Sequence, residues 1–205
     1  MKEIAIINYG MCNLDSVARA VEKCGGEPLV TAEPEAVSGA DGIILPGVGS
    51  FADAMLNLTQ RGLIAPLRER VLGHDIPFLG ICLGMQLMAA IGHEGGRSAG
   101  LGLIPGEVER LQPDTQATRI PHVGWNQVEI RQACPLFDGI ADQTDFYFVH
   151  SYHFRCDAAH RIATTPYCGG FTSVVGREHC FGVQFHPEKS LGAGQALLRN
   201  FLALC

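Results

Sequence analysis

The feature that most constrains the fold is an alternation, in the first half of the chain, between short apolar runs and helical patterns. The apolar runs lie at residues 2–9, 28–31, 42–45 and 76–79, and the helical patterns at 14–23, 51–59, 67–72 and 86–90. Apolar strands separated by amphipathic helices are typical of a parallel sheet that is covered on both faces. Asn13 is the expected N-cap of the first helix.

After about residue 100 the pattern changes to repeated strand-like runs. They lie at residues 106–111, 124–130, 146–154, 162–164, 171–175 and 181–185, and one helix is expected at 196–204. The predicted fold class is α/β, a three-layer α/β/α architecture with a mixed, mostly parallel central sheet and added antiparallel strands in the second half. Because no stretch is typical of a linker, we expect one domain spanning residues 1–205.

Composition argues against several classes of protein. The net charge is −6 without a block of Lys or Arg, which does not suit a nucleic-acid surface. No apolar run approaches the roughly 20 residues of a membrane helix, and the start of the chain has no signal-peptide cleavage site. The 8 Cys form no C-x-x-C pair, which favours reduced thiols in a cytoplasmic protein.

The sharpest local motif is GICLG at residues 80–84, between a predicted strand and a predicted helix. This is the context of a nucleophile elbow, with Cys82 in the place of serine. Glycines permit the tight turn, and the N-terminus of the following helix favours a thiolate. The N–H of Leu83 is placed to donate to an oxyanion. A core cysteine in a glycine-flanked turn is the alternative interpretation.

A thiolate nucleophile needs a proton carrier, and His186-Pro187-Glu188 offers one. If this segment is extended, residues 186 and 188 point the same way, so that Glu188 orients the ring of His186 toward Cys82. Most of the 8 His of a chain like this are structural or surface residues, so the tripeptide alone is a weak signal.

A second glycine-rich loop, PGVGS at residues 46–50, follows the third predicted strand. The N–H groups near Val48 and Gly49 are candidates for the second oxyanion donor. The same loop matches the G-x-G-x-x-A dinucleotide pattern, but that pattern usually follows the first strand and needs an acidic residue about 20 positions later.

No cofactor and no metal site are expected, because no H-E-x-x-H or paired C-x-x-C motif occurs. His150 and His153 are three apart in one strand-like run, so they are expected to face opposite sides.

Taken together, GICLGMQ at residues 80–86 and QFHPE at 184–188 resemble the class I (triad) glutamine amidotransferases. Further segments resemble, within that family, the glutaminase subunits of imidazole glycerol phosphate synthase. These are NYGMCNL at 8–14, PGVGS at 46–50, PHVGWN at 121–126, YFVHSY at 147–152 and FHPEKS at 185–190. The likeness spans nearly the whole chain.

The resemblance implies that L-glutamine is hydrolysed through a thioester on Cys82. It implies a heterodimer with a (β/α)₈-barrel cyclase subunit, which receives ammonia through a tunnel and makes imidazole glycerol phosphate in histidine biosynthesis. Glutamine-site residues implied in this way are Gly49, Leu83, Gln86, Ser151 and Tyr152. Partner-interface residues implied in this way are Asn13, Trp125, Tyr147 and Lys189.

One position departs from the family pattern: Cys12 stands where many relatives have glycine, a change that bears on the detail of the interface. Trp125, the single tryptophan, could instead be a core residue. Other functions compatible with the sequence are a free-standing thiol hydrolase of the same fold, a glutaminase that serves another acceptor, and a binding module that has kept the fold.

Overall fold

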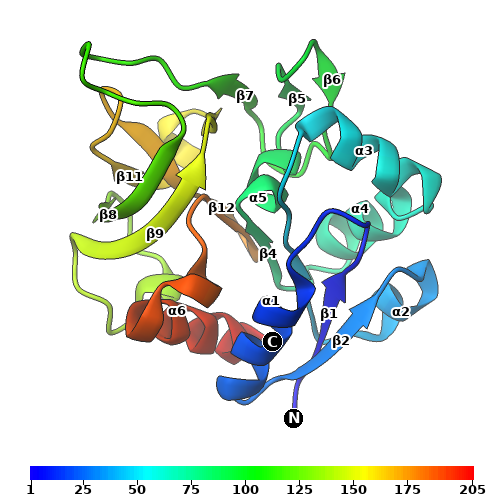
Figure 1. Ribbon diagram of the computed structural model, residues 1–205. Coiled ribbons are helices and arrows are strands. Elements are labelled where there is room, and N and C mark those ends of the chain that lie inside the picture. The colour runs from blue at the N-terminus through cyan, green and yellow to red at the C-terminus, as the bar shows by residue number, and fades with distance from the viewer.

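The computed structural model describes all residues, 1–205, and shows helices on both faces of a mixed sheet (Figure 1). The strands are β1 (Glu3–Ile7), β2 (Glu27–Thr31), β3 (Gly42–Leu45), β4 (Phe78–Ile81), β5 (Ile91–Gly92), β6 (Ser98–Ala99), β7 (Glu107–Arg110), β8 (His122–Ile130), β9 (Thr144–His150), β10 (Tyr152–Arg155), β11 (Arg161–Thr165), β12 (Phe171–Arg177) and β13 (Cys180–Val183). The helices are α1 (Leu14–Lys23), α2 (Pro34–Gly39), α3 (Phe51–Gln60), α4 (Ile64–Gly73), α5 (Leu83–Leu87) and α6 (Leu191–Leu204), with 3₁₀ turns η1 (Pro135–Phe137), η2 (Ala158–His160) and η3 (Pro187–Lys189).

The parallel part of the sheet runs in the order β2-β1-β3-β4-β13. Successive side chains of a strand point to opposite faces. In β1, Ile4 and Ile6 therefore pack with α1 and α6, whereas Ala5 and Ile7 pack with α3, α4 and α5. Apolar burial on both faces explains why these strands read as continuous hydrophobic runs.

The second half adds antiparallel strands beyond β13. β12 pairs with β13 and with β10, and β11 joins β12 to β8, which pairs in turn with β9. In Figure 1, β8 and β9 form a curved pair that stands apart from the parallel strands. The predicted three-layer α/β/α architecture with added antiparallel strands is confirmed.

Several boundaries differ from the sequence prediction. Helix α2 (Pro34–Gly39) was not predicted, because its six residues are too short for a clear helical period. The helix expected at 86–90 is α5, which begins at Leu83. The run at 146–154 breaks at Ser151 into β9 and β10, so the expectation that His150 and His153 face opposite sides of one strand loses its basis.

Two further local details concern the first helix and the loop after α5. Asn13 stands at the N-cap position of α1, but its side chain makes no capping hydrogen bond. The glycine-rich residues 92–100 form most of the small hairpin of β5 and β6. No helix is both long enough and apolar enough to cross a membrane.

Helix α6 fixes the turn that follows β13. Gly194 lies so close to this turn that a Cβ atom would stand 1.9 Å from the carbonyl oxygen of Pro187. Its N–H also donates to the carbonyl of Ser190 at 3.0 Å. The close approach of two backbones is therefore possible only with glycine at this position.

Gly194→Ala is expected to lower the free energy of unfolding by about 2 kcal/mol, since overpacking against an immobile backbone atom costs about 1–3 kcal/mol. Gly192 is a matched control two residues earlier, because a Cβ there would meet nothing within 4 Å. Gly192→Ala should be neutral or stabilising, by up to about 1 kcal/mol. Urea denaturation followed by circular dichroism measures both, and equal stability of the two variants would contradict the packing argument.

Candidate active site

Cys82 stands at a sharp turn between β4 and α5. Its backbone has φ 54° and ψ −111°, a conformation that costs a non-glycine residue about 1–3 kcal/mol. The turn is held from both sides, because the N–H of Cys82 donates to Val183 at 2.8 Å and its carbonyl accepts from Gln86 at 3.2 Å. This is the strained elbow that GICLG predicts.

Gly84 allows α5 to start against the end of β3. A Cβ atom at this position would lie 1.7 Å from the carbonyl oxygen of Leu45. The second glycine of the motif is thus required by the close approach of two backbones. This packing keeps the first turn of α5, and therefore Cys82, in a fixed place.

His186 and Glu188 form a buried pair. Nδ1 of His186 lies 2.8 Å from Oε1 of Glu188, and the two side chains are 4% and 2% exposed. The predicted pairing is present, but the predicted extended segment is wrong: Pro187–Lys189 is the 3₁₀ turn η3. The turn brings the two side chains together by curvature instead of by strand alternation.

The protonation of the His186 ring depends on Cys82 as well as on Glu188. Burial acts to lower the pKa of His186, but interactions with Cys82 and Glu188 outweigh it and raise the pKa to about 10. Nε2 is buried and has no hydrogen-bond partner of ordinary geometry. The thiol thus lies close enough to affect the imidazole without forming a full hydrogen bond.

Ser190 holds the histidine turn against β9, a role that the sequence did not suggest. Its hydroxyl donates to the carbonyl of His186 at 2.6 Å and accepts from the N–H of Tyr147 at 3.0 Å. The N–H of His186 donates to the carbonyl of Tyr147 at 2.9 Å. The only sequence signal is its place directly after the His-Pro-Glu-Lys run.

The thiol of Cys82 is nearly covered, with the residue 6% exposed. Nε2 of Gln184 lies 3.7 Å from Sγ, and Sγ lies 3.9 Å from the carbonyl of Val149. Of the glutamine-site residues implied by the resemblance, Gln86 is close by and donates to Gln184 at 3.1 Å. Gln184 is another residue that the sequence reasoning missed.

Two further implied glutamine-site residues, Ser151 and Tyr152, lie at the break between β9 and β10. Gln86 donates to the carbonyl of Tyr152 at 2.9 Å. Ser151 is half-buried and its carbonyl accepts from Leu111 at 2.9 Å. Gln86 and the Tyr152 backbone are therefore in direct contact, whereas no side-chain hydrogen bond joins Ser151 to the cysteine.

The three candidate oxyanion donors differ in availability. Leu83 is the first residue of α5, so its N–H has no acceptor within the helix. The N–H of Val48 donates to the carbonyl of Met11 at 2.8 Å, so it is already engaged by the first loop. Gly49 follows in the exposed part of the loop. In this conformation the N–H of Val48 is therefore not free to bind an oxyanion.

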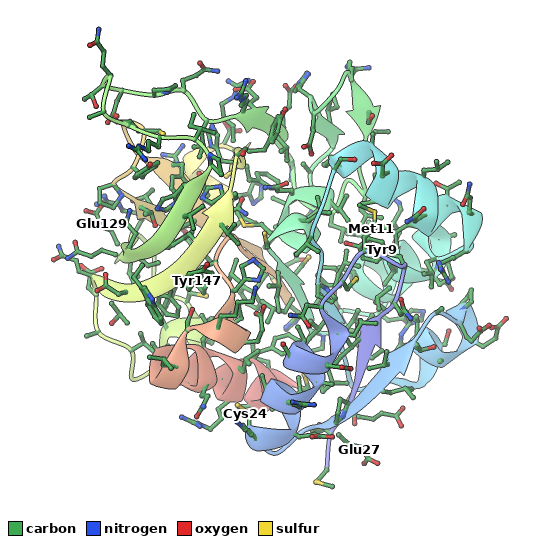
Figure 2. All side chains as sticks on the ribbon, viewed as in Figure 1. Tyr9, Met11, Cys24, Glu27, Glu129 and Tyr147 are labelled. Carbon is green, nitrogen blue, oxygen red and sulfur yellow. The ribbon has the colours of Figure 1, made fainter.

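Cys12 contacts the same loop. Its Sγ lies 3.5 Å from the carbonyl of Pro46 and 3.7 Å from that of Ile7. The residue that departs from the family pattern therefore packs directly between the first loop and the oxyanion loop. Figure 2 labels Tyr9 and Met11, which precede Cys12 in the loop after β1.

Three of the four implied interface residues cluster on one surface. The rings of Trp125 and Tyr147 meet at 6.0 Å with an interplanar angle of 67°, and Nζ of Lys189 lies 6.0 Å from the centre of the Tyr147 ring. Trp125 is 49% exposed, so its alternative interpretation as a core residue is wrong. Asn13 is exposed at the start of α1 and is not part of this cluster.

Comparison with known proteins identifies the family of the chain. The family described as "Glutamine amidotransferase class-I" matches residues 5–205. A Moorella thermoacetica protein named imidazole glycerol phosphate synthase subunit HisH is 50% identical over 202 residues, which cover 98% of this chain and 94% of the relative. The subunit HisH of Rhodospirillum rubrum is 48% identical and covers 97% of each chain.

Solved structures match the fold along its whole length. A structure titled PurLQS from Thermotoga maritima has a TM-score of 0.78 at 18% identity and covers 99% of both chains. A structure titled glutamine amidotransferase has a TM-score of 0.76 at 19% identity and covers 98% of this chain and 97% of its own. At 18–19% identity, the likeness to these two structures shows only that the fold is shared. The family match over residues 5–205 and the relatives at 48–50% identity establish that the chain belongs to the class-I glutamine amidotransferase family.

Proposed function

We propose that this chain is the glutaminase subunit of an imidazole glycerol phosphate synthase, in which Cys82, His186 and Glu188 are the catalytic residues. The observation that carries the proposal is the buried His186–Glu188 pair at 2.8 Å, whose imidazole also interacts with Cys82 at the strained elbow. The similarity to HisH subunits over 97–98% of the chain supports the choice of enzyme.

Glutamine hydrolysis follows from these three side chains. Nε2 of His186 holds the proton that the thiol has given up, and the resulting thiolate attacks the carboxamide carbon of glutamine. The imidazolium then gives the proton to the departing nitrogen as the C–N bond breaks, which releases ammonia and leaves a thioester on Cys82. Water, activated by the same ring, hydrolyses the thioester to glutamate. Glu188 keeps the ring oriented and stabilises its charged form.

The tetrahedral intermediates need donors for their oxyanion. Leu83 supplies one N–H, and Val48 or Gly49 supplies the second once the Val48–Met11 hydrogen bond has opened. Because Met11 belongs to the loop that precedes Asn13, a partner that binds this loop favours the open arrangement. Substrate contacts in this proposal are made by Gly49, Gln86, Ser151 and Tyr152.

The partner in this proposal is a (β/α)₈-barrel cyclase that forms a heterodimer with the chain and consumes the ammonia. An exposed aromatic pair beside a lysine, as at Trp125, Tyr147 and Lys189, is a suitable anchor for such an interface. The chain acts as one domain in this complex. The eight cysteines are all free thiols, which supports a reducing compartment such as the cytoplasm.

The deciding experiment is glutamate release by the chain, with and without a barrel cyclase and its ribonucleotide ligand. We expect slow hydrolysis by the chain alone, and a rise of about 10² or more when the partner frees a donor, since one oxyanion donor is worth about 10²–10³ in rate. Imidazole formation by the mixture identifies the acceptor. Full activity without a partner would favour an independent thiol hydrolase, and stimulation without imidazole formation would favour another acceptor.

Cys82→Ala should lower glutamine turnover by about 10³-fold or more while it leaves complex formation intact, because the nucleophile is lost. His186→Ala should be nearly as damaging, and Glu188→Ala less so. Cys134→Ala is the matched control, a second buried thiol away from the elbow. Ammonia supplied at high pH should restore product in all three variants of the complex. Near-normal turnover by Cys82→Ala would rule out the mechanism.

The raised pKa of His186 gives a direct test of the thiol contact. A pKa of about 10 means that the ring keeps its proton throughout the neutral range and loses it only as the pH rises through about 10. Cys82→Ala removes one of the two stabilising partners while burial remains, so it should lower the pKa of His186. Nuclear magnetic resonance of labelled histidine follows the titration. A pKa that is the same in both proteins would mean that the thiol and the ring do not interact.

A further inference from the structure

Two buried histidines form a hydrogen-bonded chain that the reaction scheme above does not use. Nδ1 of His122 lies 3.0 Å from Nε2 of His150, and Nδ1 of His150 lies 2.8 Å from the carbonyl oxygen of Tyr152. At the other end, Nδ2 of Asn126 lies 3.2 Å from Nε2 of His122. The two rings are 3% and 6% exposed.

The contacts fix the direction of every hydrogen bond. A carbonyl oxygen only accepts, so Nδ1 of His150 carries the proton and its Nε2 is an acceptor. His122 must then donate from Nδ1 and accept at Nε2. The amide of Asn126 is oriented correctly for this, because its Oδ1 accepts from the N–H of Gln127 at 2.9 Å and leaves its NH₂ for His122.

Both rings are held in the neutral form that these hydrogen bonds require. Burial lowers the pKa of His122 to about 4 and that of His150 to about 3, so neither ring is charged at neutral pH. Aromatic side chains enclose them: His122 stacks on Tyr167 at 4.0 Å, and His150 meets Phe171 edge-on at 4.7 Å. The pair is therefore a rigid, uncharged and fully directed unit.

The carbonyl oxygen of Tyr152 also connects the histidine pair to the nucleophile. Nε2 of Gln86 donates to Tyr152 at 2.9 Å and to Oε1 of Gln184 at 3.1 Å, which uses both of its N–H bonds. Nε2 of Gln184 then points to Sγ of Cys82 at 3.7 Å. With its NH₂ group occupied on both sides, Gln86 has its carbonyl oxygen left for another donor.

We propose that His150, fixed by His122, is a positioning residue for glutamine hydrolysis: it holds the Tyr152 carbonyl and thereby orients the amides of Gln86 and Gln184 around the substrate and Cys82. The inference rests on the proposed glutaminase function and adds a residue pair to it. His122 is the first residue of β8, the strand that also carries the exposed Trp125, and His150 is the last residue of β9.

A purely structural role for the histidines predicts a different outcome. A core histidine contributes to stability wherever its nitrogens find partners, and its replacement leaves the fit of the substrate unchanged in a protein that still folds. A positioning role predicts weaker binding of glutamine analogues with unchanged intrinsic reactivity of the thiol. These two properties can be measured separately with two alkylating reagents.

The test uses a chloromethyl ketone analogue of L-glutamine, which needs the substrate pocket, and iodoacetamide, which needs only the thiol. His150→Phe should raise the half-saturating concentration of the analogue about tenfold, since small errors of placement cost up to about 10² in rate. The iodoacetamide rate should be unchanged. His150→Asn keeps an N–H near the position of Nδ1 and should restore most of the analogue affinity.

His153→Phe is the matched control. This histidine lies partly buried on β10, and its ring centre is 6.3 Å from that of Phe171. It takes no part in the series of hydrogen bonds that runs from Asn126 to Cys82. It should leave the labelling by both reagents unchanged. Equal weakening by His150→Phe and His153→Phe, or unchanged analogue labelling in a folded His150→Phe, would overturn the inference.

Two measurements keep the test decisive if His150→Phe does not fold. Nitrogen resonances of the wild-type histidines should show the Nδ1–H tautomer for both rings at neutral pH, and an Nε2–H tautomer at His150 would overturn the inference. Asn126→Leu, at the half-buried end, should weaken analogue labelling in the same sense; unchanged labelling would count against it. Wild-type labelling at Cys82 that does not saturate would instead overturn the proposed function itself.

Discussion

The parallel pairing of β4 with β13 is the constraint on which the site depends. Ile81 lies opposite Val183, so the residues that follow the two strands leave the sheet at the same edge, although about a hundred positions separate them in the sequence. The segment after β4 then turns sharply at Cys82, and the segment after β13 curves through η3 so that His186 meets Glu188. Apolar burial on both faces of these strands holds the pairing, which is why a strained turn at its end is tolerated.

Much of this could be predicted from the sequence because the signals are local. An apolar strand that runs into GICLG identifies the elbow, and a histidine two residues from a glutamate suggests the pair. The 3₁₀ turn was missed because it is fixed by Ser190 and by the backbone of Tyr147, which lies 43 residues away from that serine. The His122–His150 and Gln86–Gln184 contacts join residues 28 and 98 positions apart, so no local pattern indicates them. The break at Ser151 is likewise a tertiary effect, since β10 leaves β9 to pair with β7 and β12.

Several independent contacts connect the outer strands and loops to the nucleophile. The backbone of Tyr147 holds the turn that carries His186, and the histidine pair leads from Asn126 to Gln86. The carbonyl of Met11 occupies the N–H of Val48. In each case a surface segment is one or a few hydrogen bonds from a group that the chemistry needs. Such an arrangement makes the reactivity of the centre sensitive to what binds outside it.

The near-complete covering of the Cys82 sulfur has a consequence for the durability of the protein. Peroxide attacks thiolates that solvent can reach, and the products beyond sulfenic acid are irreversible. A sulfur in a residue that is 6% exposed meets such oxidants only as often as the surrounding segments move apart. The working lifetime of this chain under oxidative stress is therefore set by how often it opens, so idle molecules should outlast those engaged in turnover.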